Sequence, residues 1–292
     1  MGCVMHLTHG LSIEGALMTA LLEVENLRIG YQGRDVVKGI SWSVGANERV
    51  AIVGESGSGK SQAVRAVADL LGAAARVHMD RLRFAGQDLL QAGPRGRASL
   101  RGKHIGMIMQ DPGYSLNPGM RVGEQIAEMY RWHRREAPKA ARQSAVDAMA
   151  RLQIENPLSV YDKYSHELSG GMGQRVMIAM MLAAEPRLLI ADEPTSALDR
   201  DNSRTVLELL DREVRARNMS LILISHDLDA VAAWCDRVIV MRQGEIIDSC
   251  VTPELGYERH PYTRALLTCV PRPGDHGSPL ATLHDFDLSA RP

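Results

Sequence analysis

A glycine-rich loop between an apolar stretch and a helix-forming stretch constrains the fold of this chain more than any other feature. Arg49–Val53 has the short apolar run of a buried strand, and Gln62–Leu71 has the composition of a helix. The loop between them consists of Gly54, Glu55, Ser56, Gly57, Ser58, Gly59, Lys60 and Ser61. A strand, a tight loop of this pattern and a helix N-terminus are typical of a phosphate-binding loop. The sequence therefore predicts a site for a nucleoside triphosphate.

Each residue type in the loop has a physical reason. Glycine lets the backbone fold around an anion with its N–H groups directed inward, and the helix N-terminus adds unpaired donors and a partial positive charge. We expect Lys60 to reach the β- and γ-phosphates and the Ser61 hydroxyl to bind Mg²⁺. A glycine turn that merely starts a helix requires neither residue, so the phosphate-binding interpretation is favoured.

Length and charge narrow the class of protein. The 292 residues suffice for one large α/β domain or two smaller ones, and a net charge of −1 does not favour nucleic acid as a partner. The long apolar stretch at Met177–Ala184 is far shorter than the ~20 residues that cross a bilayer. We expect residues 1–17 to be disordered or wrongly annotated, with Met18 as an alternative start, and residues 271–292 to form a flexible tail.

The order of the predicted elements indicates the fold class. Alternating strands and helices predict a mostly parallel sheet with helices on both faces. Before them, the alternating patterns of Leu21–Tyr31 and Val36–Val44 predict half-buried strands of an antiparallel β subdomain. Residues from about 111 to 170 are rich in helix formers and predict an inserted α-helical subdomain. We therefore expect one α/β domain over residues 18–270.

A second apolar stretch ends in two acidic residues. Leu188–Ala191 predicts a buried strand, which Asp192 and Glu193 follow. Beside the phosphate loop, Asp192 can hold Mg²⁺ through its water shell, and Glu193 can orient and deprotonate an attacking water. Many strands end in Asp-Glu, so the inference depends on the position of this pair after the phosphate loop.

A Ser-Gly-Gly sequence before a predicted helix indicates a second phosphate-binding surface. Ser169 offers a hydroxyl, Gly170 and Gly171 offer backbone N–H groups, and the helix that starts near Met172 adds its dipole. One nucleotide does not need two such surfaces from one chain. We infer that this surface serves a nucleotide held by another subunit.

The three motifs, in this order and spacing, resemble those of the ATP-binding-cassette (ABC) ATPases over Leu21–Val270. Four further positions match the family: Tyr31, Gln110, Asp199 and His226. By this resemblance the tyrosine stacks on adenine, the glutamine touches Mg²⁺ and senses a membrane partner, the aspartate belongs to a loop that crosses a dimer interface, and the histidine contacts the γ-phosphate. The resemblance thus implies a P-loop NTPase core, the cofactors ATP and Mg²⁺, and ATP hydrolysis.

The resemblance also implies partners. Two ATPase subunits, either this chain twice or this chain and a paralogue, would pair head to tail. Each nucleotide would then lie between Lys60 of one chain and Ser169 and Gly171 of the other. Two separate transmembrane permease subunits would receive the motion, and a substrate-binding protein would act through them. By the same resemblance, the chain would lie at the cytoplasmic face of the cell membrane.

Further motifs resemble those of importers of di- and oligopeptides and of nickel. They are Gln110–Pro112, Ser115–Pro118 and His260–Leu267. Gly173 departs from the basic or polar residue usual in the family, and a glycine in a helix costs about 0.5–1 kcal/mol relative to alanine. Larger peptide-importing relatives carry a cysteine cluster near the C-terminus, where this chain has only Cys269. We therefore expect no iron–sulfur cluster, and the shorter tail favours nickel or a metal chelate as cargo.

Two other classes of function are compatible with the phosphate loop. A soluble ABC ATPase without a transport role, such as an accessory of phosphonate metabolism, resembles this branch closely. A phosphotransferase could use the same loop, but the Ser-Gly-Gly sequence would then have no purpose. Neighbouring genes for a permease and a periplasmic binding protein would favour import.

Overall fold

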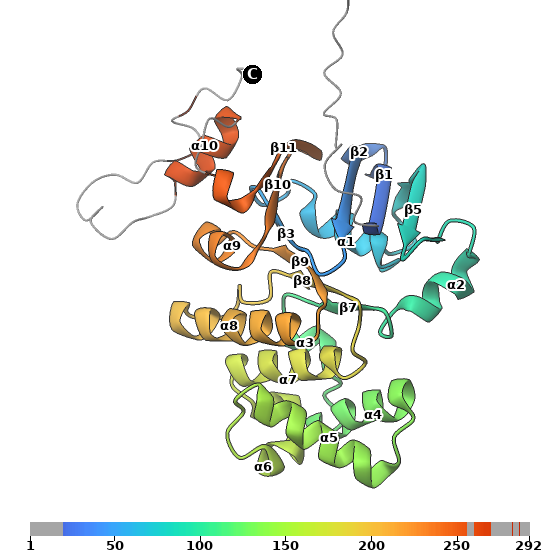
Figure 1. The fold of residues 1–292 in the computed structure, drawn as a ribbon, viewed down its shortest axis with the longest axis vertical. Helices are drawn as coiled ribbons and strands as arrows, with labels where there is room; N and C mark the ends of the chain where they lie inside the picture. Colours follow the sequence, from blue (N-terminus) through green and yellow to red (C-terminus); the bar gives the residue numbers. More distant parts are fainter. Residues whose placement is uncertain (1–19, 256–259, 270–281, 283–285, 287–292) are drawn as a thin grey trace, which may run out of the picture.

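The computed structural model describes residues 20–255, 260–269, 282 and 286. They form two β-sheets with helices packed between and around them (Figure 1). The predictions for residues 1–17, and for the tail at 271–292 apart from two isolated positions, lie outside the described residues.

A six-stranded sheet forms the centre of the domain, in the order β11-β10-β3-β9-β8-β7. In chain order its strands are β3 (Arg49–Val53), β7 (Ile105–Ile108), β8 (Leu188–Asp192), β9 (Ser220–Ile224), β10 (Arg237–Arg242) and β11 (Glu245–Val251). Five of the strands are parallel, and β11 is antiparallel to β10. Every residue of β7, β8 and β9 is buried. This explains their nearly continuous apolar sequences, because a parallel sheet is covered on both faces.

A second, antiparallel sheet has the order β2-β1-β5-β6, and β4 also pairs with β1. Its strands are β1 (Ala20–Tyr31), β2 (Arg34–Gly45), β4 (Arg76–His78), β5 (Arg81–Phe84) and β6 (Gln87–Asp88). Helix α1 (Lys60–Val67) lies between the two sheets (Figure 1), and its apolar side chains share one core cluster with β1, β2 and β3. The packing of α1 against both sheets positions the loop that precedes it.

The remaining helices of the described residues surround the parallel sheet or extend away from it. They are α2 (Gly93–Leu100), α3 (Pro112–Ser115), α4 (Val122–Arg134), α5 (Pro138–Arg151), α6 (Pro157–Tyr161), α7 (Gly170–Leu182), α8 (Arg200–Ala216), α9 (Leu228–Trp234) and α10 (Pro261–Thr268), with 3-10 turns η1 (Ser165–Glu167) and η2 (Thr252–Glu254). Helices α4, α5 and α6 form the end of the molecule opposite α10 (Figure 1). The predicted helical stretch at 111–170 thus contains α3 to α6, and its boundaries as a subdomain remain a prediction.

The structure differs from the predicted elements where the backbone turns unexpectedly. Helix α1 ends at Val67, before the predicted end, because Asp69 adopts a φ of 56° that a right-handed helix cannot continue. Within the helix-rich stretch predicted from about residue 111 to residue 170, residues 122–151 form two helices, α4 and α5. Arg135 ends α4 with a φ of 56°, and Pro138 begins α5, where its fixed φ is favourable. The connection between β6 and β7 contains a further helix, α2.

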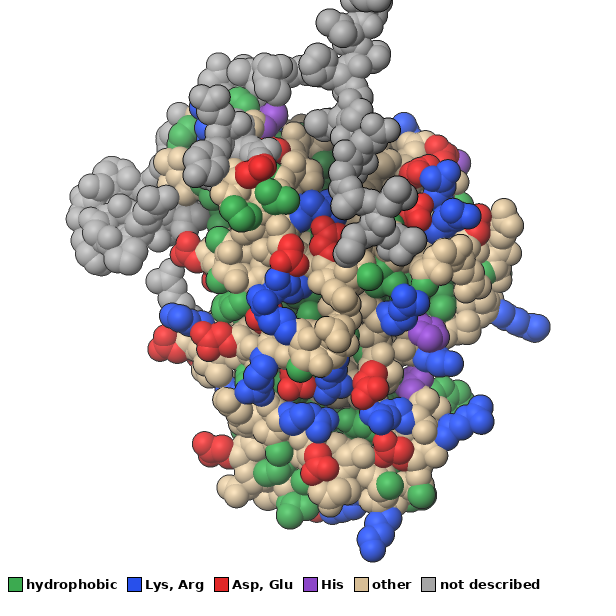
Figure 2. All heavy atoms as spheres, viewed as in Figure 1, with side chains coloured by type: hydrophobic (Ala, Val, Ile, Leu, Met, Phe, Trp, Pro, Cys, Tyr) green, Lys and Arg blue, Asp and Glu red, His purple; other side chains and the backbone are tan. Residues whose placement is uncertain are grey.

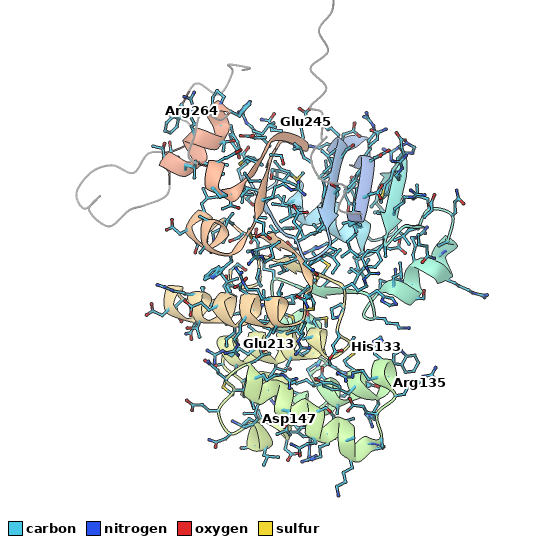
Figure 3. All side chains as sticks on the ribbon, viewed as in Figure 1. His133, Arg135, Asp147, Glu213, Glu245 and Arg264 are labelled. Carbon is cyan, nitrogen blue, oxygen red and sulfur yellow. The ribbon has the colours of Figure 1, made fainter. Side chains whose placement is uncertain are left out.

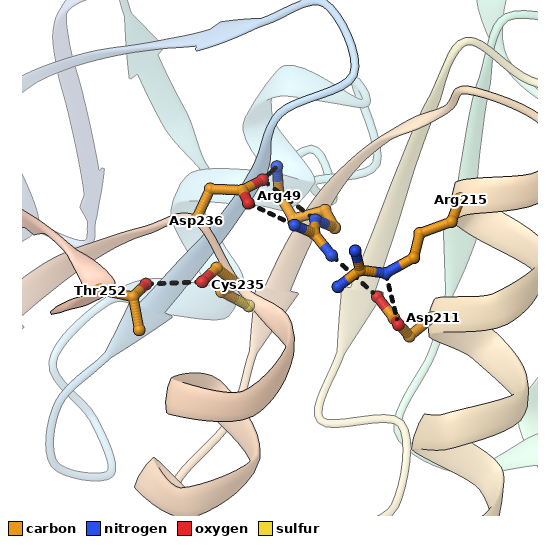
Figure 4. Close-up of polar contacts among 6 residues, drawn as sticks. All are labelled: Arg49, Asp211, Arg215, Cys235, Asp236 and Thr252. Carbon is orange, nitrogen blue, oxygen red and sulfur yellow. Dashed lines mark hydrogen bonds and ion pairs between the residues drawn. The ribbon is translucent and has the colours of Figure 1, made fainter.

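A network of charged side chains anchors the start of β3, at the opposite end of this strand from the phosphate loop (Figure 4). Arg49 donates from its backbone N–H and its Nε to Asp236 Oδ2, at 2.9 and 3.0 Å, and its Nη1 lies 3.2 Å from Asp211 Oδ1. Nearby, Thr252 Oγ1 donates to the carbonyl of Cys235 at 2.6 Å, and burial raises the pKa of the Cys235 thiol to about 12. These contacts connect β3 with α8 and with the segment between α9 and β10.

Charged side chains of both signs are interspersed on the face shown in Figure 2. Arg264 on α10 and Asp147 on α5 lie at opposite ends of the molecule, and Glu213 of α8 lies between them (Figure 3). Glu213 is buried, and its carboxylate pairs with Arg217 at 2.8 Å. The net charge of −1 is the balance of 34 Lys and Arg residues against 35 Asp and Glu residues over the whole sequence.

Candidate nucleotide-binding site

The phosphate loop lies between β3 and α1, and the side chain of Lys60 is folded inside it. Lys60 Nζ donates to the backbone carbonyls of Gly54 and Glu55, at 2.8 Å each, and Lys60 is only 6% exposed. Burial lowers the pKa of Lys60, whereas the negative charges of Glu193, Asp192 and Glu55 act in the opposite direction. The structure thus places a buried amine within the loop and close to the two acidic residues at the end of β8.

Close packing against neighbouring strands explains why the loop needs glycine. Gly54 has a φ of 143°, and a Cβ at this position would lie 2.0 Å from the backbone carbonyl oxygen of Met241 in β10. Gly59 has a φ of 100°, and its Cβ would lie 3.1 Å from the carbonyl oxygen of Val36 in β2. Both glycines therefore combine a left-handed backbone with contact to a rigid strand, which no other residue accommodates without strain.

Ser61 and Asp192 come together although they lie 131 residues apart. Ser61 Oγ donates to Asp192 Oδ1 at 2.6 Å, and Asp192 is 1% exposed. Their oxygen atoms suit Mg²⁺, which prefers oxygen ligands. Arg65, one turn further along α1, pairs with the other carboxylate oxygen at 2.9 Å. The sequence interpretation missed Arg65, although its i, i+4 spacing from Ser61 on one helix face could have indicated it.

Glu193 and His226 line one cavity of about 480 Å³ together with Gly54. Glu193 adopts a left-handed φ of 47°, and its N–H donates to the carbonyl of Ile224 at 3.1 Å. His226 is exposed at the end of β9. The carboxyl ends of the parallel strands β3, β8 and β9 bring these residues to one edge of the sheet, which is where ligands bind in such folds.

Tyr31 and Gln110 each lie beside a residue of helix α1. Tyr31 ends β1, and its hydroxyl donates to Gln62 Oε1 at 2.6 Å. Gln110 follows β7, is exposed, and lines a second cavity of about 530 Å³ together with Arg65. Because Arg65 contacts Asp192, Gln110 shares a cavity wall with a direct partner of that aspartate. The sequence interpretation also missed Gln62, and no local pattern distinguishes it from other polar residues on α1.

The Ser-Gly-Gly segment (residues 169–171) forms the N-terminus of α7 in a different cavity. Ser169 Oγ accepts a hydrogen bond from Met172 N at 3.3 Å and so caps the helix. Asp199 caps α8 by accepting from Asn202 N at 3.0 Å, and this hydrogen bond lowers the pKa of Asp199. Both caps line a cavity of about 400 Å³. None of the described residues that line it belongs to the phosphate loop.

The parallel sheet, the glycine loop after β3 and the buried lysine define an α/β nucleotide-binding domain of the P-loop class. Residues 37–196 match the family described as ABC transporter. The chain is 42% identical over 269 residues to the dipeptide transport ATP-binding protein DppD of Escherichia coli (strain K12), covering 90% of this chain and 82% of that protein. It is 42% identical over 260 residues to the oligopeptide transport ATP-binding protein OppD of Bacillus subtilis (strain 168), covering 87% and 73%.

The fold is also similar to that of a solved structure. The structure of CbiO1 from Clostridium perfringens, described as part of the ABC transporter complex CbiONQ, matches with a TM-score of 0.71 and 30% identity over 82% of this chain and 91% of that chain. The chain therefore belongs to the ABC transporter family, as an ATP-binding subunit that hydrolyses ATP. This confirms the predicted resemblance and the predicted fold class. Among the helices of the described residues, none has the length and apolar character to cross a bilayer.

Proposed function

We propose that this chain is the ATP-hydrolysing subunit of an importer of dipeptides or oligopeptides, and that it drives separate membrane subunits. The observation that carries the proposal is the 42% identity to DppD and to OppD, over 90% and 87% of the chain, because both proteins are named for peptide transport. Nickel or metal-chelate cargo, and a soluble role in phosphonate metabolism, stay predictions. We prefer peptides as the cargo because these relatives are named for peptide transport.

The geometry of the phosphate loop supports its proposed role toward ATP. Lys60 already lies inside the loop, and phosphate oxygens would replace the carbonyls that its amine now contacts. The other loop residues that we propose contact the phosphates are Gly54, Ser56, Gly57, Ser58, Gly59 and Ser61. We propose that Glu55 contributes to the loop through its carbonyl contact with Lys60, because its backbone N–H donates to Tyr262. We propose that adenine stacks on Tyr31, whose ring is oriented by the hydrogen bond to Gln62.

The oxygen ligands beside the loop support a site for Mg²⁺. We propose that Ser61, Asp192 and Gln110 hold this cation, which supplies positive charge beside the β- and γ-phosphates. Glu193, at the wall of the adjacent cavity, accepts the proton of the attacking water, and His226 donates a hydrogen bond to the γ-phosphate.

The position of the Ser-Gly-Gly segment, in a cavity that none of the described residues of the phosphate loop lines, supports a site shared between two chains. We propose that Ser169, Gly170, Gly171 and Asp199 of a second ATPase subunit, a copy of this chain or a paralogue, complete the site around the nucleotide on Lys60. The N-terminus of α7 offers backbone N–H groups that suit a phosphate. The γ-phosphate then bridges the two chains, and its loss after hydrolysis lets them separate.

The motion of the paired chains is proposed to act on two permease subunits at the cytoplasmic face of the membrane. Gln110 and the helices of 111–170 would transmit the motion, because Gln110 shares a cavity with Arg65 beside the nucleotide site. A substrate-binding protein would deliver the cargo to the permease.

Reconstitution of the chain with its permease subunits and binding protein in lipid vesicles tests the proposal. We expect ATP hydrolysis to increase when the binding protein is loaded with a dipeptide, and not when a nickel chelate is supplied. Glu193→Gln should keep ATP binding but lower steady-state hydrolysis by at least ~10²-fold, because the general base is lost.

Stimulation by the nickel chelate alone would contradict the proposed cargo. Hydrolysis that ignores both cargo and permease would favour the soluble role. Normal turnover by Glu193→Gln would remove Glu193 from its proposed part in catalysis.

A further inference from the structure

The C-terminal helix α10 contacts the phosphate loop directly. The backbone N–H of Glu55 donates to Tyr262 Oη at 2.9 Å, across 207 residues of sequence. The carbonyl of the same residue accepts from Lys60 Nζ at 2.8 Å. Tyr262 is completely buried, with 0% of its surface exposed. The Glu55 residue is therefore held at both of its backbone polar groups, once from within the loop and once from α10.

The tyrosine that makes this contact is itself held in place. Its backbone N–H donates to the His260 side chain at 3.1 Å, and the Arg242 guanidinium lies 5.1 Å from the centre of its ring. The next residue, Thr263, donates through Oγ1 to Asp248 at 2.8 Å. Burial raises the pKa of Tyr262, so its hydroxyl is neutral near pH 7. The hairpin of β10 and β11 thus fixes α10, and α10 presents a rigid acceptor to the loop.

Helix α10 also forms part of the wall of the catalytic cavity. Leu266 and Cys269 line the same space of about 480 Å³ as Gly54, Glu193 and His226. A displacement of α10 would therefore change the cavity and the loop together.

We propose that Tyr262 is a positioning residue for the phosphate loop, and that its hydrogen bond to Glu55 N–H sets the affinity of the loop for ATP. The Glu55 N–H points to α10, away from Lys60, so Tyr262 stabilises the loop from its outer side. Without this acceptor, the peptide between Gly54 and Glu55 keeps only the hydrogen bond from Lys60 to the Gly54 carbonyl, so the orientation of this carbonyl beside Lys60 is less constrained. The inference rests on the proposed role of the loop in ATP binding, and it adds a residue of the His-Pro-Tyr motif to that role.

Tyr262→Phe in the full chain removes only the acceptor hydroxyl, and Tyr161→Phe is a matched control. Tyr161 is also buried, at 1% exposure, and its hydroxyl donates to Glu124 Oε1 at 2.6 Å. This hydrogen bond joins α6, which contains Tyr161, to α4, which contains Glu124, and involves no residue of the phosphate loop. We expect Tyr262→Phe to weaken binding of a fluorescent ATP analogue about tenfold, the usual effect of one lost hydrogen bond. Tyr161→Phe should change the dissociation constant less than twofold while lowering the melting temperature of the nucleotide-free chain.

A second measurement tests the contact itself. Amide hydrogen exchange of the Glu55 N–H in the nucleotide-free chain should become about tenfold faster in Tyr262→Phe, because this N–H loses its acceptor, and should stay within about twofold of wild type in Tyr161→Phe. This measurement remains decisive if Tyr262→Phe lowers the stability of the whole fold, because global destabilisation would also accelerate exchange in the buried strands, whereas loss of the contact accelerates it in the loop alone.

The inference is overturned if Tyr262→Phe binds the analogue as tightly as wild type, or if the Glu55 N–H of Tyr262→Phe exchanges no faster than that of wild type. In both cases the wild-type chain still binds ATP. Failure of the wild-type chain to bind would instead contradict the proposed function of the loop.

Discussion

Gly54→Ala offers a test of how tightly the phosphate loop is fitted to the strand beside it. The added Cβ would lie 2.0 Å from the Met241 carbonyl oxygen, whereas real Cβ contacts essentially never fall below 3.0 Å. Met241 belongs to β10, which is paired on both sides, with β3 and with β11, so this carbonyl cannot retreat. The loop must therefore shift by about 1 Å, and a misplacement of this size can cost about 10²-fold in rate.

Gly86→Ala is the matched control for the backbone strain alone. Gly86 has a φ of +80° in the turn between β5 and β6, and a Cβ there meets nothing within 4 Å. Its expected cost is the left-handed strain of about 1–2 kcal/mol, or about 2–8 °C in melting temperature. Hydrolysis of Mg·ATP should remain within about twofold of wild type, because the strain does not reach the loop.

Calorimetric melting and phosphate release measured on both variants give the comparison. We expect both variants to melt below the wild type, Gly54→Ala further than Gly86→Ala, and only Gly54→Ala to lose about 10²-fold in kcat/KM. If Gly54→Ala hydrolyses ATP within threefold of the wild-type rate, the loop tolerates the displacement and the steric reasoning is wrong.

Two further predictions concern contacts on either side of the loop. Gln62→Ala should raise KM for ATP several-fold and leave kcat unchanged, because the Tyr31 ring loses the hydrogen bond that orients it; an equal fall of kcat and kcat/KM would contradict a role in binding alone. The second prediction concerns the carboxylate of Asp236. Burial acts to raise its pKa, but the hydrogen bonds and the positive charge of Arg49 lower it more, so the pKa of Asp236 lies below its usual value. This stabilisation is present above about pH 4, the unfolded-state pKa of Asp, and is lost as pH falls through the folded pKa. The deficit in melting temperature of Asp236→Asn should therefore be largest near pH 7 and narrow below pH 4, and a deficit that widens on acidification would contradict this pairing.

The parts of the site that lie close together in the chain are predictable from the sequence. The strand Arg49–Val53, the loop and the start of a helix follow one another, so a local pattern of apolar residues and glycines predicts all three. Asp192 is distant from Ser61, but it ends a buried parallel strand, and such strands end at the same edge of the sheet as the loop.

The parts that depend on contacts between distant side chains are not predictable in the same way. Tyr262 is recognisable as part of a motif, but nothing at its position indicates that its hydroxyl reaches Glu55. Arg65 and Gln62 lie on a predicted helix, yet their partners follow from how the sheets pack around α1. The left-handed residue Asp69 ends α1 early, and residue composition alone determines such a turn weakly.

If each nucleotide is shared between two chains, Lys60 and Ser169 of one chain contact different nucleotides. In this proposal Lys60 acts on the nucleotide of its own chain, and Ser169 acts on that of the partner. In a mixed pair of Lys60→Ala and Ser169→Arg chains, one site therefore carries both substitutions and the other carries neither. Ser169→Ala is the control for the loss of the helix cap, which by itself costs about 1 kcal/mol.

Trapping of ATP in closed pairs, measured in the Glu193→Gln background, distinguishes a shared site from two separate ones. We expect chains with Lys60→Ala and chains with Ser169→Arg each to trap almost no nucleotide alone. Their equimolar mixture should trap about one quarter of the wild-type amount, because half of the pairs are mixed and each has one intact site of two. A mixture that traps no more than either variant alone would contradict a site built from Lys60 of one copy of this chain and Ser169 of another copy.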